Sequence, residues 1–416
     1  MAHELPAECD VAIIGAGPAG LAAAAELREC GAGRVIVLDR EPEAGGIPRH
    51  CNHPPYGLRE FRRLMRGPAY AARLVQAAWD SGALIYTGAT VTALHSGPRL
   101  TVSTAAGVQN IVAGRVLLAT GVRESSRAER LIGGTKPGGV LSTGALQGLV
   151  HLRGMRPFQR PLLLGSELVA FSALLTCRKA AIRPVAMVEP CVRTVARWPA
   201  ALLPRMLGIP LHLNTDLVAI HGEDRVREVV LRGPDGKDRS LQADGVIVSG
   251  RFVPEATLLR MGHLEVDPRS GGPVVDQFGR CSDPAYFAAG NLLRPVETAG
   301  WSWEEGCRAG RAITASLRGA LPPPGGGLQV LAEGAALKYV LPQRLVPRGC
   351  GAGAADILQL RVTRPVAGRL VVTRAGAEIW SGQIRALPER RLTVPIAALP
   401  VGETGTLTLR LEERAP

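Results

Sequence analysis

The stretch "CDVAIIGAGPAGLAAAAELRECGAGRVIVLDRE", from Cys9 to Glu41, decides the fold class of the amino-terminal part of the chain. Its apolar runs and alanine-rich middle predict a series of strand, turn, helix and strand. These elements are predicted at Val11–Ile14, Ala22–Cys30 and Arg34–Leu38. A glycine-rich turn that follows a buried strand and precedes a helix indicates a dinucleotide-binding βαβ unit.

The glycines of the turn and the acid after the second strand have separate physical roles. Gly15 allows a tight turn, Gly17 lets the backbone approach a pyrophosphate, and Gly20 lets the helix pack closely on the strand. The amino terminus of the helix then faces the phosphates, and Asp39 accepts hydrogen bonds from the adenosine ribose. The candidate cofactor-binding residues of this unit are Gly15, Gly17, Pro18, Ala19, Gly20, Asp39 and Arg40.

The composition predicts a globular protein, because 46% of the 416 residues are hydrophobic and 20% are charged. The first apolar run is too short to span a bilayer and carries neither a basic leader nor a cleavage site. We therefore expect a cytoplasmic protein without a transmembrane segment. The 8 cysteines are scattered without a C-x-x-C pair, which is typical of reduced thiols.

The net charge of +13 comes mostly from arginines spread along the chain. Aromatic residues make up only 4% of the sequence, so stacking recognition of nucleic acid is not supported, and we expect no nucleic-acid partner. An acidic partner protein, an anionic lipid or an anionic substrate remains open as the reason for the charge. An arginine-rich composition without any partner role remains equally open.

Two later segments carry a resemblance to a known family. They are "RVLLATGVRE" (Arg115–Glu124) and "DPAYFAAGNLLRPVETAGWSWEEGCRAGRAI" (Asp283–Ile313). They resemble the second and third FAD segments of the two-dinucleotide-fold flavoproteins, the pyridine nucleotide-disulfide oxidoreductase superfamily. The resemblance implies further FAD contacts from Ala119, Thr120, Gly121, Gly290, Asn291, Thr298 and Ala299.

The third FAD segment departs from the family pattern at one position. The family ends a late strand with Gly-Asp, whereas this chain has Gly290-Asn291. An amide can still hydrogen-bond a hydroxyl of the ribityl chain, but without charge. The residues Glu297–Gly300 are expected to start a helix whose positive end points at the flavin pyrimidine edge. Trp301 and Trp303 are expected to pack that helix rather than to line a substrate site.

A second strand, turn, helix, strand and acid runs from Arg160 to Glu189, as "RPLLLGSELVAFSALLTCRKAAIRPVAMVE". In the family this slot binds NAD(P)H, but here the glycine fingerprint is eroded. Only Gly165 remains, and the places of the small residues are taken by Glu167, Ala170 and Phe171. A carboxylate at the turn opposes a pyrophosphate, so NAD(H) binding is expected to be weak. If the site binds a nucleotide, Glu189 favours NADH over a 2′-phosphorylated cofactor.

The stretch "GGIPRHCNHPPYG", from Gly45 to Gly57, places two histidines around Cys51. No second cysteine lies near enough for a catalytic dithiol, the ligands are too few and too crowded for zinc, and nothing indicates a low-pKa thiol. The glycines instead let the chain approach a planar ring, and basic side chains supply donors. We expect a flavin-contacting loop with Gly46, Ile47, Arg49 and His50 as contacts, and no metal site.

The longer run "GGIPRHCNHPPYGLREFRRLMRGPAYAARL" resembles the FAD-bearing subunits of amine, opine and hydroxyproline dehydrogenases and of hydrogen cyanide synthase. It is also similar to the flavoprotein companion of glycerol-3-phosphate dehydrogenase-like enzymes. The segment Leu58–Arg73 has a helical pattern, and its arginines spread over more than one face. A solvated surface is therefore expected there rather than a dedicated docking patch.

The end of the chain departs from those relatives that carry an iron–sulfur module. After the linker "LPPPGGG" (Leu321–Gly327) the only cysteine is Cys350, so the tail cannot hold a cluster by itself. Alternating stretches such as "ILQLRV" and "TLTLRL" predict a small β domain. We expect an FAD-binding domain at 1–124 and 254–322, an NAD(P)-binding-like domain at 125–253, and the β domain at 335–416.

These patterns predict an α/β fold of two Rossmann-like domains, the second inserted in the first, with a small carboxy-terminal β domain. The predicted function is an FAD-dependent oxidoreductase, an electron-transferring subunit of a heteromeric dehydrogenase. Its partners would be a second dehydrogenase subunit, a small iron–sulfur or carrier protein, and a small-molecule substrate. The alternatives are a self-contained NADH-dependent flavin reductase, a non-catalytic FAD-binding scaffold, and a self-sufficient amine or hydroxy-acid oxidase. No residue stands out as a catalytic acid or base.

Overall fold

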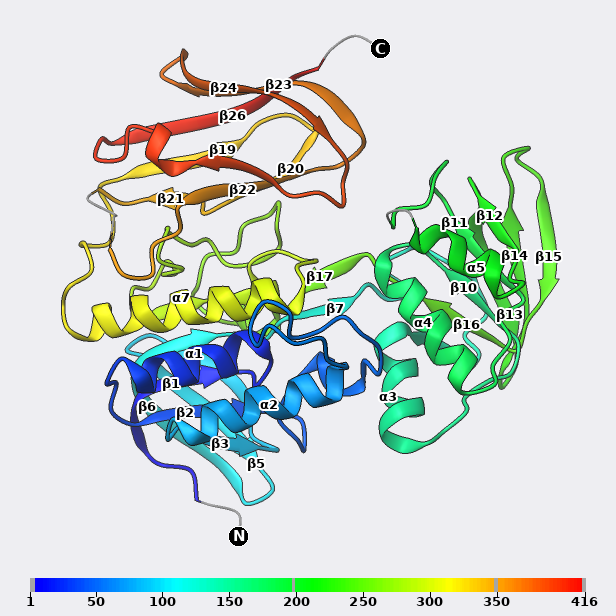
Figure 1. The fold of residues 1–416 in the computed structure, drawn as a ribbon, viewed down its shortest axis with the longest axis horizontal. Coiled ribbons are helices and arrows are strands. Elements are labelled where there is room, and N and C mark those ends of the chain that lie inside the picture. Colours follow the sequence, from blue (N-terminus) through cyan, green and yellow to red (C-terminus); the bar gives the residue numbers. More distant parts are fainter. Residues whose placement is uncertain (1–3, 197–198, 348–350, 414–416) are drawn as a thin grey trace.

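A computed structural model describes residues 4–196, 199–347 and 351–413. It has three parts, which Figure 1 separates clearly: a first α/β part in blue and cyan completed by the yellow helix α7, a second α/β part in green, and a pair of β-sheets in orange and red. The fold class predicted from the sequence is confirmed. None of the described helices combines the length and the apolar character that crossing a bilayer requires.

The first part is built on a sheet whose strands run in the order β3-β2-β1-β6-β5-β4, with β18 paired to β6. Strands β1, β2, β3 and β18 lie parallel to their neighbours, whereas β4, β5 and β6 form an antiparallel meander. The strands span Glu8–Ile14 (β1), Val35–Asp39 (β2), Leu84–Thr87 (β3), Thr90–His95 (β4), Arg99–Thr104 (β5), Gly107–Leu118 (β6) and Tyr286–Ala288 (β18).

Alternate residues of the buried strand β1 face two different cores. Val11 and Ile13 pack under the helices α1, α2 and α7, whereas Ala12 and Ile14 face the meander. The helices span Pro18–Glu29 (α1), Gly67–Asp80 (α2) and Ala299–Leu317 (α7), and the short α6 spans Thr257–Met261. Helix α1 begins before the predicted Ala22, because Pro18 occupies its first turn, where a missing N–H costs nothing.

The predicted helix over Leu58–Arg73 is wrong in its first half. Residues 58–66 form turns, and the helix α2 begins at Gly67. The backbones of Tyr56 and Met65 exchange two hydrogen bonds of 3.1 and 2.9 Å, which close the intervening residues into a loop. Within it Arg62 has a φ of 49°, which an α-helix cannot contain. Phe61 and Met65 pack from this loop onto the core, whereas Leu58 and Leu64 are more than half exposed.

The second part repeats the architecture of the first. Its parallel sheet has the order β12-β11-β10-β16-β9, with α3 and α4 on one face and a four-stranded sheet, β15-β14-β13-β8, on the other. The strands of the parallel sheet span Val140–Ser142 (β9), Pro161–Leu164 (β10), Ala186–Glu189 (β11), Leu211–Leu213 (β12) and Gly245–Val248 (β16). The helices span Thr143–Arg153 (α3), Leu168–Lys179 (α4) and Leu203–Met206 (α5), and the 3-10 turn η2 spans Ala200–Leu202.

Two short strands join the second part to the first. The strands β7 (Val122–Glu124) and β17 (Phe252–Pro254) pair antiparallel, so the chain leaves and re-enters the first part side by side. This is the predicted insertion of one nucleotide-binding-like unit into another. The facing sheet spans Gly133–Gly134 (β8), Asp216–Gly222 (β13), Val226–Arg232 (β14) and Asp238–Gln242 (β15).

The carboxy-terminal part is a sandwich of two sheets that share one apolar core. The larger sheet has the order β21-β19-β26-β23-β24 and the smaller one the order β20-β22-β25. The strands span Leu328–Ala332 (β19), Leu337–Leu341 (β20), Arg344–Leu345 (β21), Ile357–Val362 (β22), Val366–Arg374 (β23), Ala377–Ala386 (β24), Leu392–Pro395 (β25) and Gly405–Glu413 (β26), and the 3-10 turn η4 spans Ile396–Ala398. The first of these strands lies before the predicted start at 335. Cys350 lies outside the described residues.

The helices α1 and α7 pack so closely that one contact position has no room for a side chain. A Cβ atom on Gly306 would overlap the carbonyl oxygen of Ala19. Near the start of α7, Glu305 accepts hydrogen bonds from the buried Arg294 and from the Gly290 backbone N–H, the latter at 3.2 Å. The entry to α7 is thereby fixed against the first turn of α1.

We predict that Gly306→Ala lowers the free energy of unfolding by about 1–3 kcal/mol, because the added methyl group forces α7 away from α1. Gly148→Ala is a matched control, since Gly148 also lies within a helix but an added Cβ would meet nothing within 4 Å. That control should be neutral or stabilising by about 0.5–1 kcal/mol. Urea unfolding of both variants checks the prediction, and equal stability of the two would contradict it.

Candidate functional site

The turn after β1 has the geometry of a phosphate-binding turn. Gly15 has a φ of 107°, and a Cβ atom there would lie 2.5 Å from the Ala119 carbonyl oxygen. A Cβ on Gly20 would overlap the Gly15 carbonyl oxygen, so the helix sits directly on the strand end. Gly17 caps the amino terminus of α1, and a Cβ there would meet nothing within 4 Å. The space beside the helix terminus is therefore open to an anionic group.

Asp39 closes the other side of this turn. Its carboxylate is 9% exposed and accepts the backbone N–H groups of Ala16 at 2.6 Å and of Glu41 at 2.9 Å. Each carboxylate oxygen retains a second acceptor site, which suits a ribose hydroxyl. Arg40 is exposed and lies 3.9 Å from the Glu41 carboxylate, so it faces solvent beside the site.

The loop predicted to contact a flavin lies against the same turn. Gly46 has a φ of 62°, and its Cβ would be 2.8 Å from the Gly17 Cα. The loop continues into the 3-10 turn η1, Ile47–His50, in which Ile47 is 54% exposed. Arg49 differs from the expected free donor, because its guanidinium pairs with the Glu43 carboxylate at 2.8 Å.

The two remaining predicted segments meet the turn from the other side. Thr120, beside Ala119 and Gly121, donates its hydroxyl to the Glu255 carbonyl at 2.8 Å. Gly290 opens the 3-10 turn η3, Gly290–Leu292, and its Cβ would lie 2.8 Å from that of Ala19. Thr298 caps α7, and Ala299 is the first residue of the helix. The predicted FAD contacts are thus gathered around one turn, although their role as contacts stays a prediction.

Asn291, which stands where the family has aspartate, bonds through its side chain to the backbone of Glu297. Its side-chain oxygen accepts the Glu297 N–H at 2.8 Å, and its side-chain NH₂ donates to the Glu297 carbonyl at 3.0 Å. The amide thus closes the loop that leads into α7. A carboxylate has no donor and could not make both bonds, which gives asparagine a structural reason at this position.

A buried polar cluster between the first and second parts was missed by the sequence analysis. The side-chain oxygen of Gln147, on α3, lies 3.4 Å from His50 Nδ1 and 3.4 Å from Cys51 Sγ. Gln147 also donates to the Ser172 hydroxyl at 3.1 Å. Burial lowers the pKa of His50, so its imidazole is neutral at pH 7. No local sequence pattern singles out Gln147, because its partners His50, Cys51 and Ser172 lie in other segments of the chain.

Glu124 holds the joint between the two parts. Its carboxylate accepts the N–H groups of Gly144 at 2.8 Å and of Gly250 at 3.0 Å. Burial raises the pKa of this carboxyl, and the two N–H donors oppose the rise. The residue therefore ties β7 to the start of α3 and to the end of the second sheet.

The second glycine turn begins like the first, but Glu167 and Ala170 stand where the first turn has Gly17 and Gly20. Gly165 has a φ of 105°, and its Cβ would lie 2.7 Å from the Ser249 carbonyl oxygen, as Gly15 does against Ala119. At the amino terminus of α4, however, Glu167 replaces Gly17 as the cap residue. Its carboxylate accepts the Arg251 N–H at 2.7 Å and lies against Gly250. The helix cap that has no side chain in the first turn thus carries a carboxylate side chain in the second.

The other residues that the sequence analysis named in the second unit are all buried. Glu189 is 5% exposed at the end of β11, and it accepts the Ser166 hydroxyl at 2.6 Å and the Cys191 N–H at 3.0 Å. Ala170 and Phe171 are buried in α4. The sandwich contacts the second part, since Arg193 of the second part pairs with Glu389 of the sandwich at 3.2 Å.

The sandwich also holds the entry to α7. Glu297 pairs with Arg361 at 3.0 Å and with Arg391 at 2.5 Å, so its carboxylate is engaged and not free to face the site. Trp301 is stacked by two guanidinium groups, with the Arg59 Cζ atom 3.7 Å and the Arg391 Cζ atom 4.1 Å from its ring centroid. Trp303 packs on the core as predicted. No sequence pattern connects these distant residues.

The described cysteines form no disulfide, and the described residues contain no cluster of metal-ligating side chains. Cys51 is 5% exposed, and burial raises the pKa of its thiol to about 11. A thiol with this pKa is almost fully protonated at neutral pH, and so it is a poor nucleophile.

We predict that iodoacetamide at pH 8 modifies the exposed Cys191 well before Cys51, because only about one Cys51 thiol in a thousand is ionised. Peptide mass spectrometry of the native protein checks the order.

Cys51→Ser should keep flavin content and electron transfer within a few-fold of the parent. Loss of turnover in a variant that retains its flavin would show that the thiol takes part in the chemistry.

The comparisons with known proteins agree with this geometry. A sequence profile described as pyridine nucleotide-disulphide oxidoreductase matches residues 9–306. The chain is 27% identical over 318 residues to the opine oxidase A subunit of Agrobacterium tumefaciens, covering 68% of this chain and 61% of that protein. It is 25% identical over 308 residues to the sarcosine oxidase alpha subunit of Rhizobium meliloti, covering 71% of this chain and 28% of that protein.

The chain therefore spans less than two thirds of the length of these curated relatives. Among solved structures, thioredoxin reductase of T. acidophilum superposes with a TM-score of 0.61 at 20% identity, covering 75% of this chain and 99% of that one. That likeness shows the shared two-unit fold. Proteins with this sequence profile are oxidoreductases that typically bind FAD and NAD(P). The profile match over most of the chain, together with the two nucleotide-binding-like units, shows that the chain belongs to the pyridine nucleotide-disulphide oxidoreductase family.

Proposed function

We propose that the chain is an FAD-dependent, electron-transferring subunit of a heteromeric dehydrogenase that works without a redox disulfide. One observation carries the proposal: the two glycine turns share their backbone geometry, yet the first is open and a carboxylate fills the second. The open turn suits FAD and the filled one opposes NAD(P)H. The reducing equivalents would then come from a partner flavoprotein or from a substrate rather than from a nicotinamide.

The residues around the first turn suit FAD. The space above Gly17 takes a pyrophosphate, Asp39 takes the adenosine ribose, and the loop at Gly46 lies where a ring system would follow. Bound FAD would supply the two-electron acceptor of the reaction. The chain contributes the N–H groups at the start of α7, whose positive end stabilises negative charge on a neighbouring group. It also contributes the neutral imidazole of His50 as a hydrogen-bonding group. The buried Gln147 cluster beside His50 would keep water away from that side of the site.

The relatives support a heteromeric assembly. Both of the reported relatives are named as subunits of oxidases, and this chain covers only part of each. We therefore propose that one partner is a second dehydrogenase subunit. The only cysteine after the linker is Cys350, so an iron–sulfur centre in the electron path would have to come from another chain, such as a small iron–sulfur or carrier protein.

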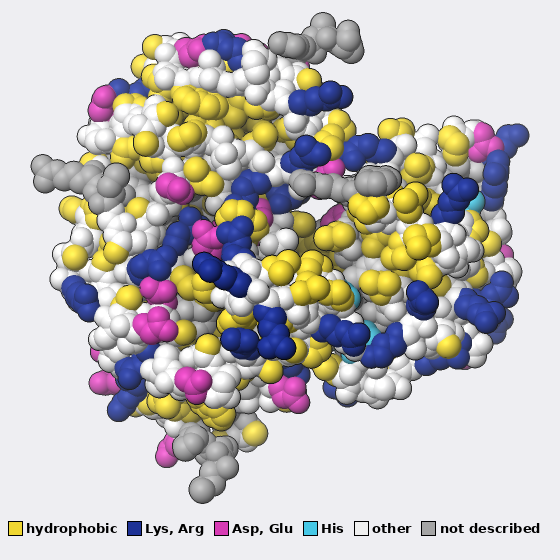
Figure 2. All heavy atoms as spheres, viewed as in Figure 1, with side chains coloured by type: hydrophobic (Ala, Val, Ile, Leu, Met, Phe, Trp, Pro, Cys, Tyr) yellow, Lys and Arg dark blue, Asp and Glu magenta, His cyan; other side chains and the backbone are white. Residues whose placement is uncertain are grey.

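No single basic stripe accounts for the net charge on the face seen in Figure 2. Lys and Arg side chains are distributed over all three parts of the molecule, with Asp and Glu between them. This distribution differs from the continuous positive track that follows a nucleic-acid backbone. It is compatible with recognition of a protein partner through several separate contacts.

A self-contained NADH-dependent reductase is the second candidate, and one observation favours it. The second turn keeps the φ of Gly165 and a buried acid, Glu189, at the end of the following strand. These are the features that hold a dinucleotide ribose. The carboxylate of Glu167 is the charged obstruction at this turn, beside the buried Ala170 and Phe171, so its removal tests the electrostatic difference between the two candidates.

We predict that Gly17→Val purifies with little FAD but folds as stably as the parent protein stripped of its flavin. No protein atom lies within 4 Å of a Cβ at this position, so the new side chain would clash only with a bound pyrophosphate. The absorbance ratio of flavin to protein and the melting temperature check both halves of the statement. Gly20→Val is the contrasting variant, because its side chain would overlap the protein itself and should impair folding. A Gly17→Val protein with full flavin would contradict the assignment.

We also predict that Glu167→Gly binds NADH up to about a hundredfold more tightly than the parent, since a carboxylate close to a phosphate costs on the order of a few kcal/mol. Glu167→Gln serves as the size-matched control: it removes the charge and keeps the bulk. Titration calorimetry on the flavin-loaded proteins gives the three dissociation constants. Equal, micromolar binding by all three proteins would remove the electrostatic argument and favour the NADH-dependent reductase.

A further inference from the structure

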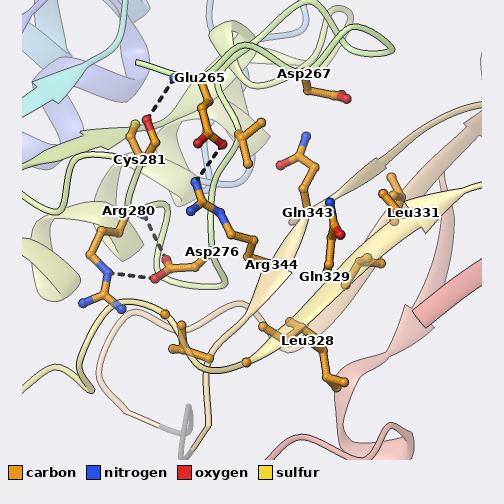
Figure 3. A pocket seen from close by; sticks show the side chains of 18 of the residues that line it. Glu265, Asp267, Asp276, Arg280, Cys281, Leu328, Gln329, Leu331, Gln343 and Arg344 are labelled. Atoms are coloured by element: carbon orange, nitrogen blue, oxygen red, sulfur yellow. Dashed lines mark hydrogen bonds and ion pairs between the residues drawn. The ribbon is translucent and has the colours of Figure 1, made fainter. Parts of the chain in front are cut away.

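A cavity of about 430 Å³ lies in the seam between the first part and the sandwich. Figure 3 shows its walls: the segment from Glu265 to Cys281 on one side, and the strand β19 with Gln343 and Arg344 on the other. The residues predicted to contact FAD do not line it. Its volume is in the range of small-molecule sites.

Buried hydrogen-bond donors without a partner collect at this cavity. Among the described residues, 6 buried side-chain nitrogens lack a hydrogen-bond partner, and 4 of these belong to cavity-lining residues. The four atoms are Arg280 Nη2, Gln343 Nε2, Arg344 Nε and Arg344 Nη2. Arg280 is 4% exposed and Gln343 is 7% exposed. Buried polar atoms are nearly always hydrogen-bonded, so four unmatched donors in one place indicate an acceptor-rich occupant.

The two free atoms of Arg344 define the chemistry of that occupant. Nε and Nη2 lie on one edge of the guanidinium, and that edge binds a carboxylate or a phosphate through two parallel hydrogen bonds. The nearest carboxylate, that of Glu265, lies 3.7 Å from Nη2, too far for a hydrogen bond, and its side chain is 66% exposed. The edge is therefore available to a second acceptor.

The other acids of the cavity already have donors. Asp276 accepts Arg280 Nε at 2.8 Å and two backbone N–H groups, and Asp267 accepts the Ser270 N–H at 2.8 Å. The Gln343 side-chain oxygen accepts the Val275 N–H at 3.1 Å, which leaves only the NH₂ of its amide unmatched. The buried side-chain atoms that remain without a hydrogen-bond partner among the described residues of the cavity are therefore donors, and the Glu265 carboxylate is largely exposed.

We propose that this cavity is a binding site for a small anion that carries a carboxylate or a phosphate, seated on the Nε and Nη2 edge of Arg344. The amide NH₂ of Gln343 supplies a further donor at the cavity. The apolar walls from Val274 and Leu328 suit an anion with a short aliphatic body. Because both the first part and the sandwich line the site, an occupant would also strengthen their docking. The proposal does not depend on the proposed function.

The test is titration calorimetry of the flavin-loaded full chain with succinate and with inorganic phosphate at constant ionic strength. We expect saturable binding of at least one of them and a rise in melting temperature on its addition. Binding of succinate alone identifies a carboxylate occupant, and binding of phosphate alone identifies a phosphate occupant. Absence of binding and of any melting shift with both anions would overturn the proposal and leave a water-filled cavity.

Three variants locate the site. Arg344→Lys keeps the charge but loses the two-nitrogen edge, and it should weaken binding about tenfold or more. Glu265→Gln removes the nearest competing carboxylate and should strengthen binding. Arg364→Gln is the matched control, because Arg364 lies in the sandwich outside the cavity and pairs with Glu413 at 2.7 Å. Unchanged affinity in Arg344→Lys, in a protein with parental melting temperature, would place any binding elsewhere and overturn the assignment.

Discussion

The fold of the first part depends on close backbone approach at a single turn, residues 15–20. The helix α1 sits on the strand end through Gly20, the loop that precedes η1 touches the turn through Gly46, and α7 crosses α1 through Gly306. A Cβ at any of these positions would strike the turn or the first turn of α1. Segments far apart in the sequence are thereby held around Gly17, the one position of the turn that stays open. Absence of side chains, rather than any polar contact, creates the space for a cofactor.

The turn of the second part carries a side chain at the position that corresponds to Gly17. This turn keeps the left-handed glycine, Gly165, and the same contact with the neighbouring strand, but the cap of α4 carries a side chain. The Glu167 carboxylate takes a backbone N–H at the edge of the second sheet and so replaces a ligand with a protein group. The strand order and the apolar cores of this part are nevertheless complete without a nucleotide.

Local sequence patterns predicted those elements whose structure depends on residues close together in the sequence. The two βαβ units, the insertion and the β tail follow from glycine spacing, apolar periodicity and turn residues. The loop at 58–66 was predicted as part of a helix from its overall pattern, yet Phe61 and Met65 pack on the core from a loop that the backbone of Tyr56 closes. The clamp on Glu297 and the polar cluster at Gln147 join residues far apart in sequence. Such contacts follow from how the parts dock, which a single sequence does not encode in any local pattern.

The most direct test of the account is anaerobic stopped-flow spectroscopy of the flavin-loaded chain, first by itself and then with a co-expressed candidate dehydrogenase subunit. The account predicts that NADH bleaches the flavin absorbance slowly and only at high concentration. The partner dehydrogenase with its substrate should bleach the same flavin rapidly. Rapid, complete reduction of the isolated chain by micromolar NADH would contradict the account, because it would show that Glu167 does not close the second nucleotide site.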